Sequence, residues 1–327
     1  MSSVATSTRD ESVEELERYR VELTAYCYRM LGAGSEAEDA VQETLTRAWR
    51  AYGDFEGRAA VRTWLYKIAS NVCFDYLKSS QRRALPMDMG GPGTVEGPLG
   101  PRLAEPTWVM PVPDGRVLSA VDPAELAATR ESIRLAFVAA LQYLPPKQRA
   151  VLILREVLRW EATEVAALLE TSVASVNSAL QRARATLSAK DLSPADAAAV
   201  VLGPDDRKLL QQYVEAFEAY DIGLLTTLLH EDAQQQMPPY ELWLSGRDEI
   251  LKWWFGPGIG CKGSKLVPTA ANGQPAFGQY RKDPAGGYEA WALQTFRTDG
   301  ERVIEMTFFL DVGHVFPYFG LPLRLDG

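Results

Sequence analysis

The sequence predicts a multidomain protein in which two all-α helical domains precede one α+β domain. Three observations support this class. Apolar residues recur at helical spacing through residues 13–83 and again through 122–190. Residues 84–121, which separate them, are rich in proline and glycine, as linkers are. From residue 204 onward, helical stretches are followed by short strand-like segments, and 327 residues suffice for several cores.

The composition restricts the classes of function. A net charge of −9 disfavours nucleic-acid binding over the whole surface, so any DNA contact must be local. Cys27, Cys73 and Cys261 lie far apart in a chain with two histidines, which predicts no disulfide framework, no metal site and a reducing cytoplasm. Neither a signal peptide nor a long apolar run is present, so we expect no membrane contact. Nothing in the sequence calls for a cofactor.

The first domain, residues 13–83, follows a small polar tail at 1–12 that we expect to be disordered. A helix is predicted from Val13 to Leu31, and a capping box at 35–38 predicts the start of a second helix that ends near Ala51. Its inward residues are predicted to be Ala37, Val41, Leu45, Ala48 and Trp49. Its outward residues are predicted to be Glu36, Asp39, Gln42, Glu43 and Arg47. This acidic face is either solvated or fits a basic helical partner.

A third helical stretch spans residues 61–83. The predicted buried stripe consists of Val61, Leu65, Ile68, Val72, Tyr76 and Leu77. The opposite side carries cations and polar groups around one acid, with aromatic residues between them: Arg62, Lys67, Asn71, Lys78, Arg82, Arg83, Asp75, Trp64, Tyr66 and Phe74. Cations beside aromatic rings suit single-stranded DNA, because each stacked base contributes roughly 1–3 kcal/mol. The alternative is that the aromatic residues belong to the core.

The segment 84–121 reads as a linker, because its prolines and glycines oppose ladders and helices. Apart from docking by Trp108, Val109 and Met110, it is not expected to bury apolar surface. Its acids outnumber its arginines, so it would avoid DNA and fit a positively lined channel.

The second helical domain, residues 122–190, begins with the helix-start signal Asp122-Pro123-Ala124-Glu125. This helix is predicted to reach Tyr143, and the prolines that follow break it. A further helix is predicted over 147–158. Residues 163–184 then read as two short helices joined by a tight turn at 170–172.

The last of these helices has the pattern of a DNA-reading helix. Ser172 is the predicted N-cap, and one face is anchored by Val173, Val176, Ala179, Leu180 and Ala183. The other face presents hydrogen-bonding groups and cations: Ser172, Ser175, Asn177, Ser178, Gln181, Arg182 and Arg184. No acid occurs from residue 171 to 190, which favours approach to phosphates. The alternative is an ordinary helical hairpin with a solvated face.

The C-terminal domain, residues 204–327, follows a short linker at 191–203. Helices are predicted at 204–219 and 222–229 with Asp221 as N-cap, and a third at 248–255. Strands are predicted near 233–237, 265–270, 276–281, 288–297 and 302–312, which together imply an α+β cone with a mostly antiparallel sheet.

Such a cone encloses an apolar pocket. The candidates for lining it are His230, Met237, Tyr240, Trp243, Trp254, Trp291 and Phe308. The alternative for the aromatic residues is core filling. No pair of acid and base matches a catalytic dyad, so we predict no enzyme activity.

These features, in this order, resemble a known family. The acidic helix, the basic helix with its tryptophan, the linker and the stretch LPPKQRAVLILREVLRWEATEVAALLETSVASVNSALQRARATL at 144–187 are similar to bacterial RNA polymerase sigma factors. More narrowly, they resemble the extracytoplasmic-function group (group IV) of the sigma-70 family, with 13–83 as region 2 and 122–190 as the helix-turn-helix region 4. The stretch at 213–251 resembles the SnoaL-like fold of polyketide cyclases and ketosteroid isomerases.

The resemblance implies a transcription factor that binds core RNA polymerase and directs it to promoter DNA. Asp39, Gln42, Glu43 and Arg47 would bind the coiled coil of the largest polymerase subunit, and the flap region is a second expected contact. The −10 element would be melted and read by Trp64, Asn71, Asp75, Lys78, Arg82 and Arg83. The −35 element would be read by the helix from Ser172 to Arg184. The linker would thread the active-site cleft, and the SnoaL-like domain, with or without a small ligand in its pocket, would regulate activity.

Three departures limit this comparison. Asn177 and Ala179 stand where many members carry a lysine and an arginine, so a different −35 sequence is expected. Glu170 replaces the usual turn glycine, so it must adopt left-handed geometry or the turn must be reshaped. The linker is also longer than usual. Two alternatives stay open: a free-standing ligand-sensing helix-turn-helix regulator, and a DNA-binding module fused to a small isomerase-like or cyclase-like enzyme.

Overall fold

The chain folds into two compact units in a computed structural model that describes residues 14–55, 57, 60–78, 82–118, 129–130, 132–189 and 204–327. The N-terminal unit comprises Met1–Arg83 and Asp114–Ala198, and the C-terminal unit comprises Ala84–Pro113 and Ala199–Gly327. The predicted tail at 1–12, the helix start at Asp122 and the linker at 191–203 lie outside the described residues. Within the described ranges, no helix is both long enough and apolar enough to cross a membrane.

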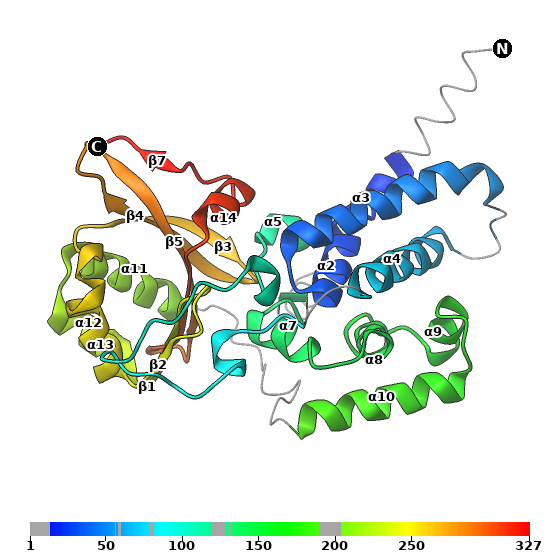
Figure 1. Ribbon diagram of the computed structural model, residues 1–327. Coiled ribbons are helices and arrows are strands. Elements are labelled where there is room, and N and C mark those ends of the chain that lie inside the picture. Colours follow the sequence, from blue (N-terminus) through cyan, green and yellow to red (C-terminus); the bar gives the residue numbers. More distant parts are fainter. Residues whose placement is uncertain are drawn as a thin grey trace, which may run out of the picture. The chain divides into compact units, whose positions relative to one another are not determined.

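The long helices among the described residues in the first half of the N-terminal unit are α2 (Arg20–Leu31), α3 (Gly34–Ala51) and α4 (Val61–Leu77), with the short turn η1 (Tyr52–Asp54) after α3. They lie side by side (Figure 1) and pack on one another. α2 ends at Gly32, whose φ of 79° allows its N–H to bond to the Tyr28 carbonyl. The predicted capping box is wrong, because α3 begins at Gly34 and Ala33 makes no side-chain cap.

The buried side of α4 also differs from the predicted stripe. Its buried residues are Leu65, Tyr66, Ala69, Ser70, Val72 and Cys73. Tyr66, expected on the outer side, is fully buried between Tyr26 and Trp160, with both pairs of ring centroids 5.0 Å apart. Helix α4 is therefore covered on two sides, whereas a periodicity argument assumes one.

In the second half of the N-terminal unit, the described residues form five helices and one π-helical turn. These are α5 (Asp114–Val117), α7 (Leu135–Leu141), α8 (Pro146–Leu152), η4 (Ile153–Val157), α9 (Ala162–Leu168) and α10 (Val173–Ser188). The continuous helix predicted up to Tyr143 is wrong, because Arg134 is extended (φ −56°, ψ 142°) and α7 starts after it. The predicted helix at 147–158 is π-helical over its second half. The two all-α domains themselves are confirmed.

The C-terminal unit is an α+β domain, as predicted. Its elements are α11 (Pro204–Ala219), α12 (Ile222–Leu228), β1 (Leu229–Gln236), β2 (Trp243–Ser245), α13 (Arg247–Phe255), η5 (Pro257–Cys261), β3 (Lys265–Ala271), β4 (Gln274–Lys282), β5 (Tyr288–Thr298), β6 (Val303–Phe309), α14 (Val312–Tyr318) and β7 (Arg324–Leu325). The sheet has the order β2-β1-β6-β5-β4-β3, with β7 beside β5. Only the β1–β6 pair is parallel among the described strands, which fits the predicted mostly antiparallel sheet.

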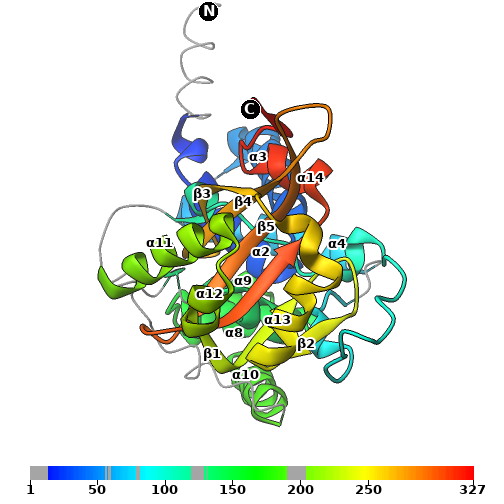
Figure 2. The ribbon, with the colours of Figure 1, turned by 90° about the vertical axis from the view of Figure 1, so that its left-hand side faces the viewer.

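Helices α11, α12 and α13 lie in front of this sheet in Figure 2. The core between them is dominated by aromatic and branched side chains such as Tyr213, Phe217, Trp254 and Phe296. Asp221 caps α12 as predicted, since its carboxylate accepts the N–H of Leu224 at 3.0 Å. The predicted strand at 302–312 ends earlier, at Phe309, and α14 follows.

Residues 84–113, which we call the docked segment, belong to the C-terminal unit and include the turns η2 (Pro86–Asp88) and η3 (Glu105–Thr107). Backbone N–H groups of Gly93 and Leu103 donate to the carbonyls of Trp243 and Pro239, both at 2.9 Å. Single β-bridges join Ala84 to Trp108 and Pro113 to Ala271. These are isolated bridges and not ladders, so single backbone bonds outside the strands dock the segment.

Buried apolar side chains hold the docked segment in place. Trp108, Val109, Met110 and Val112 are all buried, and Trp108 is only 1% exposed. A Cβ at Gly93 would come within 2.4 Å of Cδ1 of Leu242, so the end of that side chain would have to move. Docking by Trp108, Val109 and Met110 was expected, and Val112 joins them. Their burial offsets the ordering entropy of the proline-rich segment.

Candidate nucleic-acid interface and ligand cavity

The helix-turn-helix is built by α9, the turn at 169–172 and α10. Glu170 in this turn has a φ of 51°, so it adopts the left-handed geometry that a glycine would accept more readily. Ser172 caps α10 as predicted, because its hydroxyl accepts the N–H of Ser175 at 3.1 Å. Helix α10 is anchored by the buried residues Val176, Ala179, Leu180, Ala183 and Leu187. Val173 was expected inside and is instead 38% exposed.

The opposite face of α10 is open to solvent. All seven residues predicted to read the −35 element are exposed: Ser172, Ser175, Asn177, Ser178, Gln181, Arg182 and Arg184. Arg184 donates from Nε to Glu156 at 2.6 Å, so its cation is partly neutralised within the domain. Within the described part of the chain, Arg182 makes no ion pair. Gln181 and Arg182 are therefore the longest side chains free to reach DNA on this face.

The residues predicted to act at the −10 element are not all on one surface. Trp64 is half-buried, with its ring 4.7 Å from that of Phe55. Asn71, Asp75 and Lys78 are exposed, and the bond from Lys78 lowers the pKa of Asp75.

Arg82 and Arg83 have opposite orientations. The structure places Arg82 on the surface, 4.1 Å from the ring centroid of Tyr143. Arg83 is 4% exposed and donates to Glu36 at 2.6 Å. The chain is not helical here, so neighbouring side chains point to opposite sides. Placing Arg83 on a DNA-facing surface is therefore wrong for this conformation, and Glu36, expected outside, is its partner.

The two helical domains contact each other within the N-terminal unit. Lys67 of α4 pairs with Glu170 of the helix-turn-helix turn at 2.6 Å, and this bond lowers the pKa of Glu170. The guanidinium of Arg62 lies 5.4 Å from the ring centroid of Trp160. The buried Arg149 donates to the carbonyl of Met30. No sequence signal marked these contacts, since they join residues about a hundred positions apart.

The outer face of α3 gathers the residues predicted to bind core polymerase. Asp39, Gln42 and Arg47 are exposed and Glu43 is half-buried. Arg47 donates to Glu43 at 2.7 Å, one turn away on the same face. Trp49, expected inside, is 37% exposed beyond this group. An acidic, partly apolar strip on α3 is therefore available for a partner.

The C-terminal unit contains a cavity of about 470 Å³, which we call the aromatic cavity. Five predicted residues line it: Met237, Tyr240, Trp254, Trp291 and Phe308. His230 and Trp243 are not among its lining residues. The His230 ring accepts the N–H of Asp232 at 3.1 Å, and the indole of Trp243 donates to Gly90 of the docked segment at 2.9 Å.

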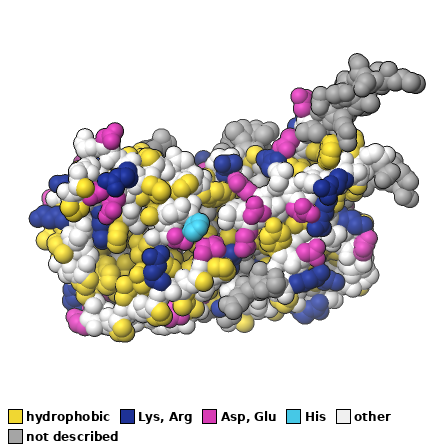
Figure 3. Space-filling view, turned by 45° about the horizontal axis from the view of Figure 1, so that its top comes forward, with side chains coloured by type: hydrophobic (Ala, Val, Ile, Leu, Met, Phe, Trp, Pro, Cys, Tyr) yellow, Lys and Arg dark blue, Asp and Glu magenta, His cyan; other side chains and the backbone are white. Residues whose placement is uncertain are grey.

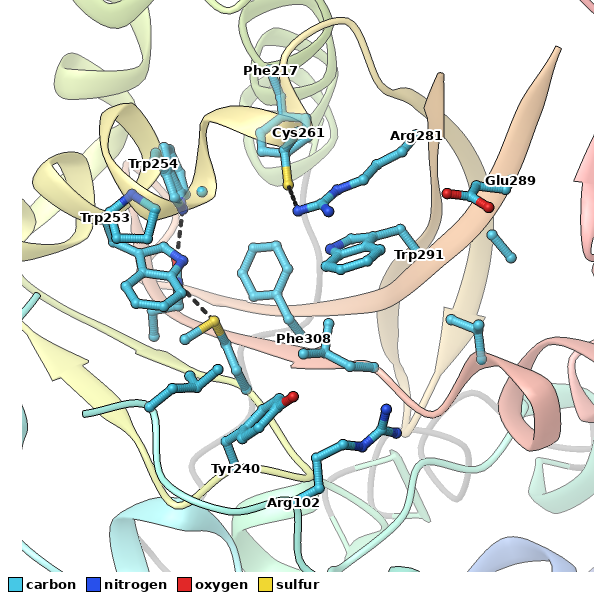
Figure 4. Close-up of a pocket in the computed structure, with 18 of the residues that line it drawn as sticks. Arg102, Phe217, Tyr240, Trp253, Trp254, Cys261, Arg281, Glu289, Trp291 and Phe308 are labelled. Atoms are coloured by element: carbon cyan, nitrogen blue, oxygen red, sulfur yellow. Dashed lines mark hydrogen bonds between the residues drawn. The ribbon is translucent and has the colours of Figure 1, made fainter. Parts of the chain in front are cut away.

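Other lining residues were not foreseen, above all Arg281 and, from the docked segment, Leu99 and Arg102. Figure 4 shows Arg281, Trp291, Phe308 and Tyr240 around the same space, and Figure 3 shows hydrophobic side chains gathered with cations on the C-terminal unit. These residues come from strands and loops far apart in sequence, so only the folded sheet brings them together.

The chemistry of the aromatic cavity suits binding more than proton transfer. Among the described residues that line it there is neither a histidine nor an aspartate, and Glu289 is its one carboxylate. Glu289 is exposed. Burial raises the pKa of Tyr220 to about 12, so this hydroxyl stays protonated at neutral pH.

Comparison with known proteins accounts for this architecture. Residues 16–83 match Sigma-70 region 2, and residues 134–187 match Sigma-70, region 4. The ECF RNA polymerase sigma factor SigG of Mycobacterium tuberculosis is 43% identical over 322 residues, which cover 97% of this chain and 86% of that protein.

More distant relatives agree. The ECF RNA polymerase sigma factor SigJ of the same species is 28% identical over 263 residues, covering 76% of this chain and 75% of SigJ. The crystal structure of M. tuberculosis SigJ shares the fold, with a TM-score of 0.61 at 23% identity over 95% of this chain and 99% of that one. The two matched regions and the near full-length likeness to SigG lead to one conclusion: this chain belongs to the ECF RNA polymerase sigma factors of the sigma-70 family.

Proposed function

We propose that this promoter-directing sigma factor reads the −35 element with the exposed face of α10 and the −10 element with α4 and the residues after it. The observation that carries the proposal is the face of α10, where seven hydrogen-bonding or cationic residues are exposed and no acid interrupts them. The acid-free face matters in a chain of net charge −9, because repulsion from phosphates would otherwise oppose docking.

Two side chains on α10 are placed to read bases. Gln181 can bond both polar atoms of an adenine edge, and Arg182 can bond those of a guanine, each worth ~1–3 kcal/mol of discrimination. Ser172 and Ser175 at the helix start are short and near backbone N–H groups, so they suit phosphate contacts. Arg184 is tied to Glu156 and would contribute less.

The −10 contacts are proposed for Trp64, Asn71, Lys78 and Arg82, with Asp75 holding Lys78. Exposed cations would follow the backbone of the displaced strand while bases stack on rings. Arg83 would act indirectly instead, because its pairing with Glu36 fixes the chain after α4 against α3.

Core polymerase is the proposed partner of the α3 strip. Asp39, Gln42, Glu43 and Arg47 present carboxylates with one cation, which fits a basic helical surface such as the coiled coil of the largest subunit. Region 4 would meet the flap region. The protein would act in the cytoplasm, where the polymerase transcribes.

The C-terminal unit is proposed to regulate rather than catalyse. It holds residues 84–113, the stretch that in this family lies between the two DNA-reading domains. A segment docked on this unit through Trp108 cannot at the same time thread a polymerase channel. The C-terminal unit therefore competes with polymerase for the segment, and a small ligand in the aromatic cavity would shift that competition.

Run-off transcription with core polymerase tests the proposal. We expect Gln181→Ala and Arg182→Ala each to lower output from a promoter with the preferred −35 element, and to lose the difference between that promoter and one with a changed −35 element. Ser188→Ala, at the exposed far end of the same helix, is the matched control and should match the wild type. Unchanged promoter choice in both variants would remove α10 as the reader, and tight sequence-specific duplex binding without polymerase would favour a free-standing regulator.

A further inference from the structure

The aromatic cavity has the dimensions of a small-molecule site and a lining with one dominant chemistry. Its volume of about 470 Å³ falls within the range of roughly 300–1,000 Å³ that ligand pockets occupy. Trp254, Trp291, Phe308 and Phe217 present rings to it from four different elements. Flat, apolar molecules fit such walls, because rings offer large contact areas at little entropic cost.

Some polar groups in these walls already bond one another. The indole of Trp254 donates to Gln235 at 2.7 Å, and the amide of Gln235 donates to the sulfur of Met237 at 3.6 Å. The hydroxyl of Tyr220 donates to the carbonyl of Trp254. A ligand would have to break these bonds in order to use the same groups.

Arg281 differs from these neutral groups because it brings a positive charge to the wall. Its guanidinium lies 3.2 Å from the ring centroid of Trp291 and donates from Nη2 to Cys261 at 3.1 Å. Its Nε is buried and has no hydrogen-bond partner in the described part of the protein, and no described carboxylate forms an ion pair with it. Glu289 faces it across the β4–β5 register but is exposed and makes no such pair.

Stacking on Trp291 leaves the N–H groups of the guanidinium in its own plane. Nε is buried and Nη2 bonds Cys261, so the donors left for a ligand are those of Nη1 and the second N–H of Nη2. These two lie side by side at the end of the guanidinium, and this geometry matches a carboxylate better than any neutral group. Arg102, the second cation at the cavity, is exposed, and the described residues offer it no ion pair. Two arginines against one exposed glutamate leave the site with a net positive charge.

We propose that the aromatic cavity binds a small planar aromatic carboxylate. Its carboxylate pairs with Arg281, and its ring lies among Trp254, Trp291 and Phe308. Arg102 and Leu99 complete the site from the docked segment, so that the bound molecule holds this segment on the C-terminal unit.

The claim that the ligand holds the docked segment rests on the proposed regulatory role. The claim that the cavity binds an aromatic carboxylate does not. Leu99 and Arg102 lie between two backbone bonds that dock the segment, at Gly93 and Leu103. A ligand that needs these contacts binds the docked state, so the ratio of docked to undocked segment rises by the factor 1 + L/Kd, where L is the free ligand concentration.

Binding is tested on the full chain without polymerase. The probe is 2-naphthoate, and its neutral analogue is 2-naphthamide; quenching of tryptophan fluorescence at neutral pH reports occupancy. We expect saturable quenching by the acid and at least about tenfold weaker binding of the amide. Arg281→Met should weaken binding of the acid by a similar factor, Arg281→Lys should retain part of it, and Arg302→Met, an exposed arginine outside the cavity, should leave it unchanged.

Thermal unfolding of each variant separates lost binding from lost folding. Equal affinity for the acid and the amide, or an Arg281→Met variant that folds and binds the acid normally, would overturn the assignment of an anion site. Absence of saturable quenching by the acid would overturn it as well.

Hydrogen exchange tests the coupling separately. We expect 2-naphthoate to slow exchange of the Gly93 and Leu103 amides in the wild type but not in Arg102→Met. Binding without slowed exchange would refute the coupling while leaving the site intact. Because neither measurement involves DNA or polymerase, a failed promoter assay would be distinguishable from a failed ligand site.

Discussion

Replacing Trp108 with alanine should release the docked segment without unfolding the C-terminal unit. Trp108 is 1% exposed and is one of the largest fully buried side chains in the described protein. Its ring system buries about 200 Å², which corresponds to an upper limit of ~5 kcal/mol at 25 cal/mol per Å². Measured Trp→Ala losses of roughly 3–5 kcal/mol agree. The ratio of docked to undocked segment should fall by about two to four orders of magnitude.

Hydrogen exchange followed by mass spectrometry measures this change. The amides of Leu103, Val109 and Asn272, which bond across or within the docked segment, should exchange faster by a similar factor. Amides paired between β4 and β5 should keep their protection, since Trp108 lies outside that sheet.

Two further variants complete the test. Gly93→Val should produce the same pattern through a collision with Leu242, whereas Met89→Ala, at a side chain 40% exposed, should not. Unchanged exchange at Leu103 in Trp108→Ala would refute the idea that buried apolar area holds the segment. Equal loss of protection in β4 and β5 would show that the segment and the sheet do not separate.

The remaining predictions concern the N-terminal unit and one tyrosine. Arg83→Met should lower the free energy of unfolding in urea by ~2 kcal/mol, because Glu36 loses its partner. Arg82→Met should leave this free energy unchanged but reduce promoter opening, which permanganate footprinting measures. Glu170→Gly should melt at a higher temperature than Glu170→Ala in calorimetry, since both lose the carboxylate and only glycine accepts a φ of 51° freely; equal midpoints would contradict strain in the turn. Tyr220 has a pKa raised above its unfolded value, so the folded state holds the phenol proton to higher pH and the free energy of unfolding should fall between about pH 10 and 12. Denaturation of Tyr220→Phe should show a shallower fall in this range. An identical pH profile in the variant would count against burial of Tyr220 as the cause.

Local signals predicted the fold most successfully where one helix face was solvated and caps were intact. Helix α10 began after Ser172 and α12 after Asp221, as expected, because each cap satisfies a backbone N–H that is otherwise unpaired. Of the two outcomes expected at Glu170, left-handed geometry or a reshaped turn, the structure shows the first. These features depend on residues within one or two turns of each other.

Contacts between residues far apart in sequence explain the features of the fold and of the cavity that could not be predicted from the sequence. The buried stripe of α4 was wrong because Trp160 covers Tyr66 from a second side. Residues 84–113 were interpreted as part of a linker because of their proline and glycine content, and of the four apolar residues that bury there only Val112 was not named as a docking residue. The cations of the cavity were missed because their role depends on the fold: Arg281 looks like any exposed strand cation until the fold places Trp291 beneath it.

Site-specific crosslinking in the initiation complex tests the central claim most directly. A photoreactive residue at Ser178, exposed in the middle of α10, should crosslink to promoter DNA within the −35 element when core polymerase is present. The same residue placed at Arg302, in the C-terminal unit, should not crosslink there. Crosslinks from Ser178 that map elsewhere, or that are absent from a complex that still transcribes, would contradict promoter reading by this helix.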